Sequence, residues 1–338
     1  MKRKMEVPIA EIARRAGVSN ATVSRVLNNT GVVRAETCKR VYAVLESLHI
    51  DVEETILTAP PAGKLILFNL PFDLNPFFNE IFQGAKTSAQ QHGYNILINQ
   101  EHVNANTHKK LERMLRDLKV AGVIFLNHIE PEYLDRLLAL VPIVQCCDCS
   151  VRRPNVSSVG VDDFKAARVV MDYIYSLGCR RVAFLSTSLK YSDMRNRKLG
   201  YLQSLKDRGI EPLSPWIVQL PEVNYDMALS VATQILSHPI RPDAFFAAAD
   251  ILSIAVVNAA RSLNIRVPED LVVVGYDNTE YSRISNPAIT TMNHSKFQVG
   301  FSTCELLVEK IRNPQAVAQH ISLPTELVIR ASSQIRHE

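Results

Sequence analysis

Short apolar runs alternate with longer amphipathic segments over most of the chain, from residue 64 to about residue 313. The short runs are typical of parallel strands covered on both faces, whereas the longer segments repeat apolar residues at the spacing of a helix. The predicted strands are residues 65–70, 94–100, 120–126, 141–147, 180–186, 243–249 and 270–278, with one more at the start of 290–313. The predicted helices are residues 77–93, 108–119, 131–140, 164–178, 194–209, 227–238 and 251–264, with one more at the end of 290–313. This alternation predicts parallel α/β sheets.

The α/β pattern pauses near residues 159–162 and then restarts. The string LILFNLP, followed by NPFFNEIFQGAK, resembles the later string RVAFLSTS, followed by RNRKLGYLQSLK. Residues 64–338 are therefore predicted to form a core of two similar lobes. The predicted lobe 1 covers about 64–160 and 293–320, and the predicted lobe 2 covers about 161–292 and 321–333. A ligand cleft is expected between the carboxyl ends of the two sheets.

The first 50 residues have a different pattern, with helical periods and no strand-like run. A first helix is predicted over residues 9–16, after which Gly17 is suited to end it and Ser19 to cap a second helix. A third helix over residues 35–48 closes the domain with an apolar face of Val41, Val44, Leu45 and Leu48. Two short helices joined by a tight turn describe a helix-turn-helix, whose second helix fits the major groove of DNA.

The second predicted helix carries small and polar side chains on the face opposite Val23, Val26 and Leu27. This outward stripe consists of Asn20, Ala21, Ser24, Arg25 and Asn28. An Arg grips guanine bidentately, an Asn grips adenine, and an alanine methyl group meets the thymine methyl group. The alternative is a solvated helix face in an ordinary bundle.

The distribution of charge favours the DNA-binding interpretation. Residues 1–50 hold nine Lys or Arg against four acids, a net charge of +5. The other 288 residues hold 29 bases and 30 acids, a net charge of −1. The positive excess thus lies around the predicted reading helix, where neutralisation of DNA phosphates needs it. Residues 1–50 are therefore predicted to bind double-stranded DNA.

The string VSNATVSRVLNN, followed by VVRAETCKRVYAVLESL, resembles the headpiece of the lactose-repressor family of bacterial transcription factors, and the resemblance continues to the C-terminus. It implies an all-α helix-turn-helix headpiece, an α/β two-lobed core like that of periplasmic sugar-binding proteins, and a homodimer. By this resemblance, Asn20, Ala21 and Arg25 match base-reading positions, while Thr22, Ser24 and Asn28 match positions that contact the DNA backbone or flanking bases. The chain departs from the family at Arg34, where a Ser is frequent, and at Cys38, where an Arg is frequent.

Residues 51–63 are predicted to form the link between headpiece and core, and they depart further from the family. Family members usually carry here a basic hinge helix with a Leu that wedges into the minor groove and bends the DNA. This chain instead has three acids, Asp51, Glu53 and Glu54, and has Ala59 about where the Leu is expected. Either Ile56 or Leu57 serves as a shifted wedge, or the segment is a plain spacer; the spacer is favoured. Operator binding with less bending is expected.

Composition excludes several classes of protein. No apolar run reaches the 18 residues of a membrane span, and the N-terminus lacks the apolar stretch of a secretory signal, so a cytoplasmic protein is expected. The six cysteines favour free thiols, and Cys146, Cys147 and Cys149 are expected to line a buried strand end rather than to bind zinc. No GxSxG, HExxH, P-loop or GxGxxG motif is present, so no enzymatic activity, cofactor or metal is predicted.

Polar and aromatic residues that follow the predicted strands are the candidates for binding a small effector. They are Asp73, Asn75, Phe77, Asp148, Arg197, Asp250 and Asp277. The motif NPFF matches the family's first ligand loop, and Arg197 and Asp277 match its effector-binding positions. The alternatives are that Phe77 is a core residue, that Arg197 forms a surface ion pair, and that Asp250 caps the next helix.

The combined prediction is a ligand-responsive transcriptional regulator, with repression favoured, whose dimer binds a near-palindromic operator and whose effector alters DNA affinity. An Asp–Arg pair with an aromatic wall suits a sugar. A nucleoside is the alternative, because VPIVQCCDC and RKLGY resemble the cytidine-regulator branch of the family. A solute-binding receptor shares the core but needs an export signal and has no use for a basic headpiece. A hydrolase on the same scaffold lacks a nucleophile constellation.

Overall fold

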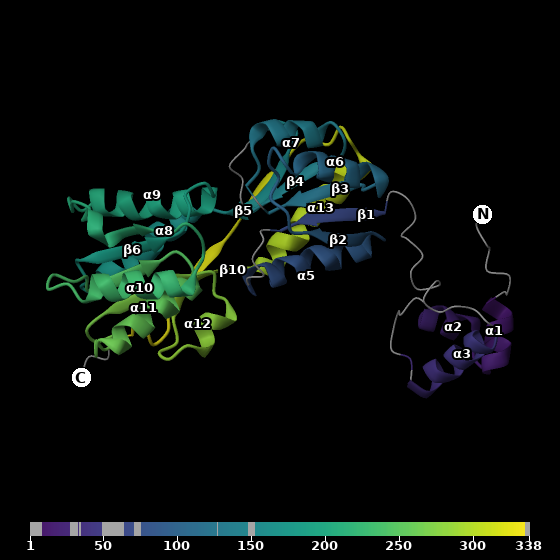
Figure 1. Cartoon of the computed structure of the whole chain (residues 1–338), viewed down its shortest axis with the longest axis horizontal. Helices are drawn as coiled ribbons and strands as arrows, with labels where there is room; N and C mark the ends of the chain where they lie inside the picture. Colours follow the sequence, from purple (N-terminus) through teal and green to yellow (C-terminus); the bar gives the residue numbers. More distant parts are fainter. Residues whose placement is uncertain are drawn as a thin grey trace. The chain divides into compact units, whose positions relative to one another are not determined.

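The computed structural model describes residues 9–27, 33, 35–48, 64–70, 76–126, 128–147 and 153–334. The chain divides into two compact units, residues 1–62 and residues 63–338, and each is described by itself (Figure 1). Within the described residues, no helix has the length and apolar character needed to cross a membrane.

The first unit is a bundle of three short helices, α1 (Ile9–Ala16), α2 (Asn20–Leu27) and α3 (Ala35–Ser47). Its small core is built from the apolar positions of all three helices, which are Ile12, Ala13, Ala16, Val23, Val26, Val41 and Leu45. Gly17 ends α1 with a φ of 63°, a conformation that glycine adopts without strain, and the next amide bonds back to the carbonyl of Ala13. The predicted helical headpiece is confirmed.

The first lobe of the second unit contains a six-stranded sheet in the order β11-β5-β4-β3-β1-β2, with every pair parallel. Its strands are β1 (Leu65–Asn69), β2 (Asn95–Asn99), β3 (Gly122–Phe125), β4 (Ile143–Cys146), β5 (Ser157–Val161) and β11 (His320–Leu323). Helices α5 (Pro76–Gln91) and α13 (Lys296–Arg312) cover one face, and α6 (His108–Asp117) and α7 (Pro131–Leu138) cover the other. Because all strands run the same way, their carboxyl ends meet at one edge.

The second lobe repeats this plan with the strand order β12-β10-β9-β8-β6-β7. Its strands are β6 (Val182–Ser186), β7 (Ile217–Gln219), β8 (Ala244–Ala247), β9 (Val272–Tyr276), β10 (Thr290–His294) and β12 (Thr325–Val328), and only β12 is antiparallel to its neighbour. Helices α8 (Asp163–Ser176) and α9 (Ser192–Lys206) pack on one face. Helices α10 (Tyr225–Leu236) and α11 (Asp250–Ser262) pack on the other, and the short α12 (Glu280–Ile284) follows β9. The predicted α/β architecture of two lobes is confirmed.

The points where the chain passes between the lobes differ slightly from the predicted boundaries. The chain leaves the first sheet after β5, which ends at Val161. It leaves the second sheet after β10, which ends at His294. Residues 321–333 were expected in the second lobe, but β11 runs to Leu323 and pairs with β5 of the first sheet. Pro324, which lacks an amide donor, separates β11 from β12, so the transfer between sheets falls there.

Helices α5 and α13 pack against each other with their backbones unusually close. At Gly84 of α5 and Gly300 of α13, an added Cβ atom would overlap a carbonyl oxygen of the facing helix, that of Phe297 and that of Ile81 respectively. Only glycine permits this approach. The two helices of the first lobe therefore form one rigid pair.

Candidate functional site

Helix α2 presents one apolar and one polar face, as a reading helix requires. Val23 and Val26 are buried against α1 and α3, whereas Asn20 and Arg25 are exposed. The hydroxyl of Ser19 accepts a hydrogen bond from the amide of Thr22 at 3.1 Å, which caps the helix. The side chains of Ala21 and Ser24, and the whole of Asn28, lie outside the described residues.

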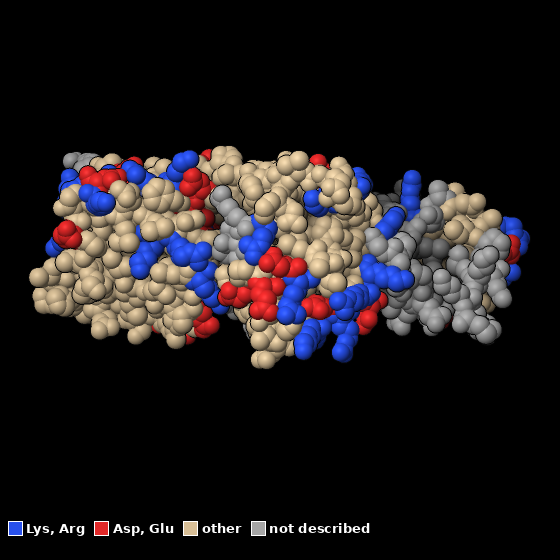
Figure 2. All heavy atoms as spheres, turned by 90° about the horizontal axis from the view of Figure 1, so that it is seen from above, with Lys and Arg blue, Asp and Glu red and all other residues tan. Residues whose placement is uncertain are grey.

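The basic side chains of α1 and α2 differ in their ion pairs. On α1, Arg14 and Arg15 both form ion pairs of 2.7 Å with Glu11. Arg25 is exposed, and none of the ion pairs between described residues involves it. On the face seen in Figure 2, acidic and basic side chains lie next to each other in several places. Arg25 thus has the exposure that a base contact requires.

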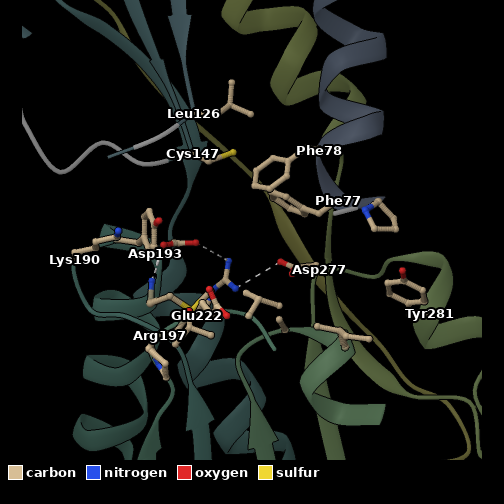
Figure 3. Close-up of a pocket in the computed structure, with 18 of the residues that line it drawn as sticks. Phe77, Phe78, Leu126, Cys147, Lys190, Asp193, Arg197, Glu222, Asp277 and Tyr281 are labelled. Atoms are coloured by element: carbon tan, nitrogen blue, oxygen red, sulfur yellow. Dashed lines mark hydrogen bonds and ion pairs between the residues drawn. The ribbon is translucent and has the colours of Figure 1, made fainter. Parts of the chain in front are cut away.

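A cavity of about 530 Å³ lies where the carboxyl ends of the two sheets face each other. The first lobe contributes Phe77, Phe78, His102, Leu126 and Cys147 to its wall. The second lobe contributes polar side chains, among them Lys190, Asp193, Arg197, Glu222, Asp277 and Tyr281. In Figure 3, Phe77 and Phe78 lie at the start of α5, on the same side of the cavity as Cys147 and Leu126. This volume is within the range of small-molecule sites.

Arg197, on α9, is held from several sides and is only 3% exposed. Its Nε donates to Oδ1 of Asp163 at 2.8 Å, and its Nη1 donates to the carbonyl oxygen of Ala248 at 2.6 Å. The guanidinium carbon lies 3.6 Å from the ring centre of Tyr276, close enough for a cation–π contact. The predicted alternative of a surface ion pair is wrong, because this ion pair is buried.

Two further carboxylates approach Arg197 from the cavity side (Figure 3). Oδ2 of Asp193 lies 3.7 Å from Nη2, and Oδ1 of Asp277 lies 3.5 Å from Nη1. Burial lowers the pKa of Arg197, but the attraction of Asp163 and Asp277 outweighs it, so that its pKa rises well above the usual value. Arg197 is therefore a permanent cation surrounded by three acids.

Asp277 follows β9 and is the least satisfied of these acids. It is 6% exposed, and its Oδ1 accepts no hydrogen bond from any residue that the structure describes. Burial raises its pKa to about 7, against the opposing attraction of Arg197. Its φ of 101° lies in the region that favours glycine. A buried oxygen without a donor, at the wall of a cavity, is suited to accept a hydrogen bond from a bound molecule.

Asp250, which was expected at the ligand cleft or as a helix cap, is not among the residues that line this cavity. Its Oδ2 accepts hydrogen bonds from the amide and hydroxyl of Thr279 at 2.6 and 2.9 Å, and its Oδ1 accepts one from Thr291 at 2.6 Å. The absence of a side chain at Gly275 makes room for this carboxylate, since a Cβ there would lie 2.7 Å from Oδ1. Asp250 is not the cap of α11 either, because that helix is preceded by Ala249. It ties the loop after β9 to β10.

The remaining predicted residues fall into two groups. Phe77 lines the cavity and also packs in the core of the first lobe, with its ring edge-on to those of Phe78 and His294. Asp73, Asn75 and Asp148 lie outside the described residues. Effector contact by any of the predicted residues stays a prediction.

Asp163, Asp193 and Glu222 were not among the residues predicted from the sequence. Asp193 stands four residues before Arg197, the spacing of a helical ion pair, so this signal was present. Asp163 is 34 residues from Arg197 and follows Asp162, which caps α8 by accepting from the amide of Lys165. Only the folded chain brings Asp163 to the guanidinium group.

Two of the three clustered cysteines lie in the described part of the chain, at and just after the end of β4. Cys146 is buried at the end of β4, and Cys147 lines the cavity. Cys149 lies outside the described residues. Among those that are described, no group of three or more His, Cys, Asp or Glu is arranged to hold a metal ion.

Comparisons with known proteins find relatives for both units of the chain. Residues 8–49 match the model of bacterial regulatory proteins of the lacI family, and residues 171–333 match that of the periplasmic binding protein-like domain. The chain is 29% identical over 332 residues to the HTH-type transcriptional repressor PurR of Edwardsiella ictaluri, with 96% of each chain covered.

Solved structures cover the same length. The lac repressor dimer bound to operator and the anti-inducer ONPF is similar with a TM-score of 0.73 at 25% identity, covering 97% of this chain and 99% of the other. The complex of the transcriptional regulator CelR with cellobiose has a TM-score of 0.74 at 24% identity, covering 97% of this chain and 100% of the other. The second likeness concerns the fold alone.

Proposed function

The chain belongs to the lacI family of bacterial regulatory proteins, and from this premise we propose that it is a transcriptional repressor with an uncharged effector, a sugar in the first place. Two copies bind a near-palindromic operator, and the effector occupies the cavity between the lobes. The observation that carries the proposal is the exposed pair Asn20 and Arg25 on a helix whose other face is buried.

The DNA-binding part follows from the chemistry of α2. An exposed Arg donates two parallel hydrogen bonds to guanine, and an exposed Asn pairs with adenine in the same groove. Arg25 is in none of the ion pairs between described residues, whereas Arg14 and Arg15 share Glu11. We therefore assign sequence readout to Arg25 and Asn20.

The preference for an uncharged effector follows from the charge of the cavity. Arg197 is opposed by the carboxylates of Asp163 and Asp193 and, above the pKa of about 7, also by that of Asp277, so little net attraction remains for an anion. Of the other charged groups on the wall, Glu222 is acidic and Lys190 is basic. A phosphate or carboxylate would have to approach Asp193 and Asp277 at short range, where like charges repel strongly. Hydroxyl groups, in contrast, donate to carboxylate oxygens.

A nucleoside is the second candidate, and the rings on the first-lobe wall favour it. Phe77 and Phe78 meet edge to face, with centroids 5.0 Å apart, and both border the cavity. Such rings pack against a flat heterocycle as well as against the apolar face of a sugar. A solute-binding receptor without regulatory DNA binding is disfavoured, because residues 8–49 match a DNA-binding family.

The test uses purified full-length protein and has two arms. In the first, duplexes are selected from a random pool at about 0.1 M salt, where exposed charges still interact over roughly 10 Å. In the second, thermal shifts are measured with matched pairs, namely ribose and ribose 5-phosphate, and cytidine and cytidine monophosphate. Saturation at about 100 times the dissociation constant stabilises the protein by roughly 2.7 kcal/mol.

Each arm has its own refutation. Failure to enrich any duplex sequence refutes the DNA-binding part. Tighter binding of a phosphorylated member than of its neutral partner refutes the charge argument for the effector. Stabilisation by cytidine but not by any sugar replaces the first candidate with the second.

A further inference from the structure

Lys296 is a buried cation that joins the two lobes beside the cavity. It is the first residue of α13 and is only 3% exposed, although lysine is among the residues least often buried. Its Nζ donates to the backbone carbonyl of Asp277 at 2.9 Å and to that of Asn278 at 3.4 Å. Oε1 of Glu80, on α5, lies 3.6 Å away. A buried ammonium group is tolerated only with such partners.

On the second-lobe side, Lys296 holds a strained turn. Asp277 and Asn278 have φ values of 101° and 49°, both unusual for residues other than glycine. Such conformations persist only where surrounding contacts enforce them. The turn that Lys296 stabilises is the one that directs the Asp277 carboxylate towards Arg197 and the cavity.

On the first-lobe side, Lys296 belongs to a rigid body. Its helix, α13, is locked to α5 by the close approach at Gly84 and Gly300. Helix α5 begins with the residues that form the cavity wall, Phe77 and Phe78, and carries Glu80 one turn later. The ammonium group of Lys296 therefore contacts both the turn after β9 and α5.

We propose that Lys296 is a positioning residue that couples the Asp277–Asn278 turn of the second lobe to the α5–α13 pair of the first lobe. The proposal rests on the proposed function in one respect, namely that the cavity is an effector site. The coupling itself is a mechanical property of the core, and it gives effector contact at Asp277 a direct route to the first lobe.

The test is amide hydrogen exchange of the full-length protein, with no DNA or small molecule added. Lys296→Met removes the charge and keeps an apolar stem, Lys296→Arg keeps the charge, and Lys310→Met is the matched control on the same helix. Lys310 donates to the carbonyl of Ala316 and touches no part of the second lobe among the described contacts. The reporter segments are 277–280 in the second lobe and 76–83 in the first.

Lys296→Met is expected to accelerate exchange about tenfold in both segments, the scale of one lost charge-assisted hydrogen bond. Lys296→Arg is expected to restore much of the protection, and Lys310→Met to leave both segments unchanged. Acceleration confined to one segment, or an equal effect of the control, overturns the proposal.

A second variant covers the case in which Lys296→Met does not fold. Glu80→Gln alters a side chain that is 53% exposed and leaves the lysine in place. It is expected to accelerate exchange in 277–280, in the lobe that does not contain it, by about twofold. Unchanged exchange in that segment contradicts the coupling. Because neither variant depends on DNA or effector, these results are independent of the selection and thermal-shift arms.

Discussion

Replacing Asp277 with Asn is expected to make the core more stable at pH 8 and to change it little in acid. In the folded protein, burial raises the pKa of Asp277 from 3.8 to about 7, whereas in the unfolded chain the carboxyl group titrates near its ordinary value. Between these values the folded state holds a proton that the unfolded state has lost. The stability of the wild type therefore falls as the pH rises towards 7 and stays lower above it.

The shift in pKa sets the size of the effect. A change of one in pKa corresponds to about 1.4 kcal/mol. Ionised Asp277 therefore lowers the free energy of unfolding by about 4 kcal/mol in total. Of this, about 3 kcal/mol develops between pH 5 and pH 8. Asn resembles the protonated acid in shape and does not titrate. The difference in unfolding free energy between Asp277→Asn and the wild type should grow by about 3 kcal/mol over this interval.

The chain contains a convenient reporter for this measurement. Trp216 is its single tryptophan, and it is buried in the second lobe, which also holds Asp277. Urea unfolding followed by Trp216 fluorescence from pH 5 to pH 8 gives the required free energies. Asp270→Asn is the matched control, because hydrogen bonds from Arg266 hold the pKa of Asp270 at about 2, below the whole interval.

Comparison of variants removes the contributions that both proteins share. Burial raises the pKa of Asp250 to about 6 and lowers that of His294 to about 3, and both groups are present in each protein. A difference between Asp277→Asn and the wild type that is the same at pH 5 and pH 8 would show that the carboxyl group is not desolvated, and the reasoning would fail.

Four other predictions follow from the two units. Arg25→Ala should cost about 1–3 kcal/mol of operator affinity at one base position, while Arg14→Ala leaves selectivity unchanged; a binding assay on duplexes with single substitutions measures both. Arg197→Ala should abolish the effect of effector on operator affinity and leave affinity without effector intact, and a normal response would misplace the cavity. Gly300→Ala should destabilise the core by about 3 kcal/mol or more in urea unfolding, because the new methyl group meets a carbonyl of α5. A circular-permutation gel assay should reveal little bending, since residues 51–63 are acidic; a strong kink would contradict the spacer interpretation.

The amino-acid pattern predicts the architecture well where both faces of a strand are buried. Strand β3, for example, is buried at every position, so its uninterrupted apolar run is easily recognised. Strands β11 and β12 were not predicted, because they lie at sheet edges, are half-exposed and mix polar with apolar residues. Periodicity carries little information for such short edge strands.

The candidate site is predictable only in part for a different reason. Arg197 and Asp277 stand directly in segments whose motifs point to a cleft, so one sequence suffices to single them out. The partner of Arg197 at Asp163, and that of Asp277 at Lys296, depend on contacts between elements that are distant along the chain. Asp250 shows the opposite case. Its position after a strand suggested the cleft, but its carboxylate accepts hydrogen bonds from Thr279 and Thr291 within the second lobe.

The chain passes between the sheets three times. The last passage, between β11 and β12, determines what a truncation near the C-terminus removes. Since β11 completes one sheet and β12 the other within nine residues, a premature stop codon shortly before residue 320 removes an edge from both lobes at once. Late truncations should therefore weaken both lobes at once rather than one of them.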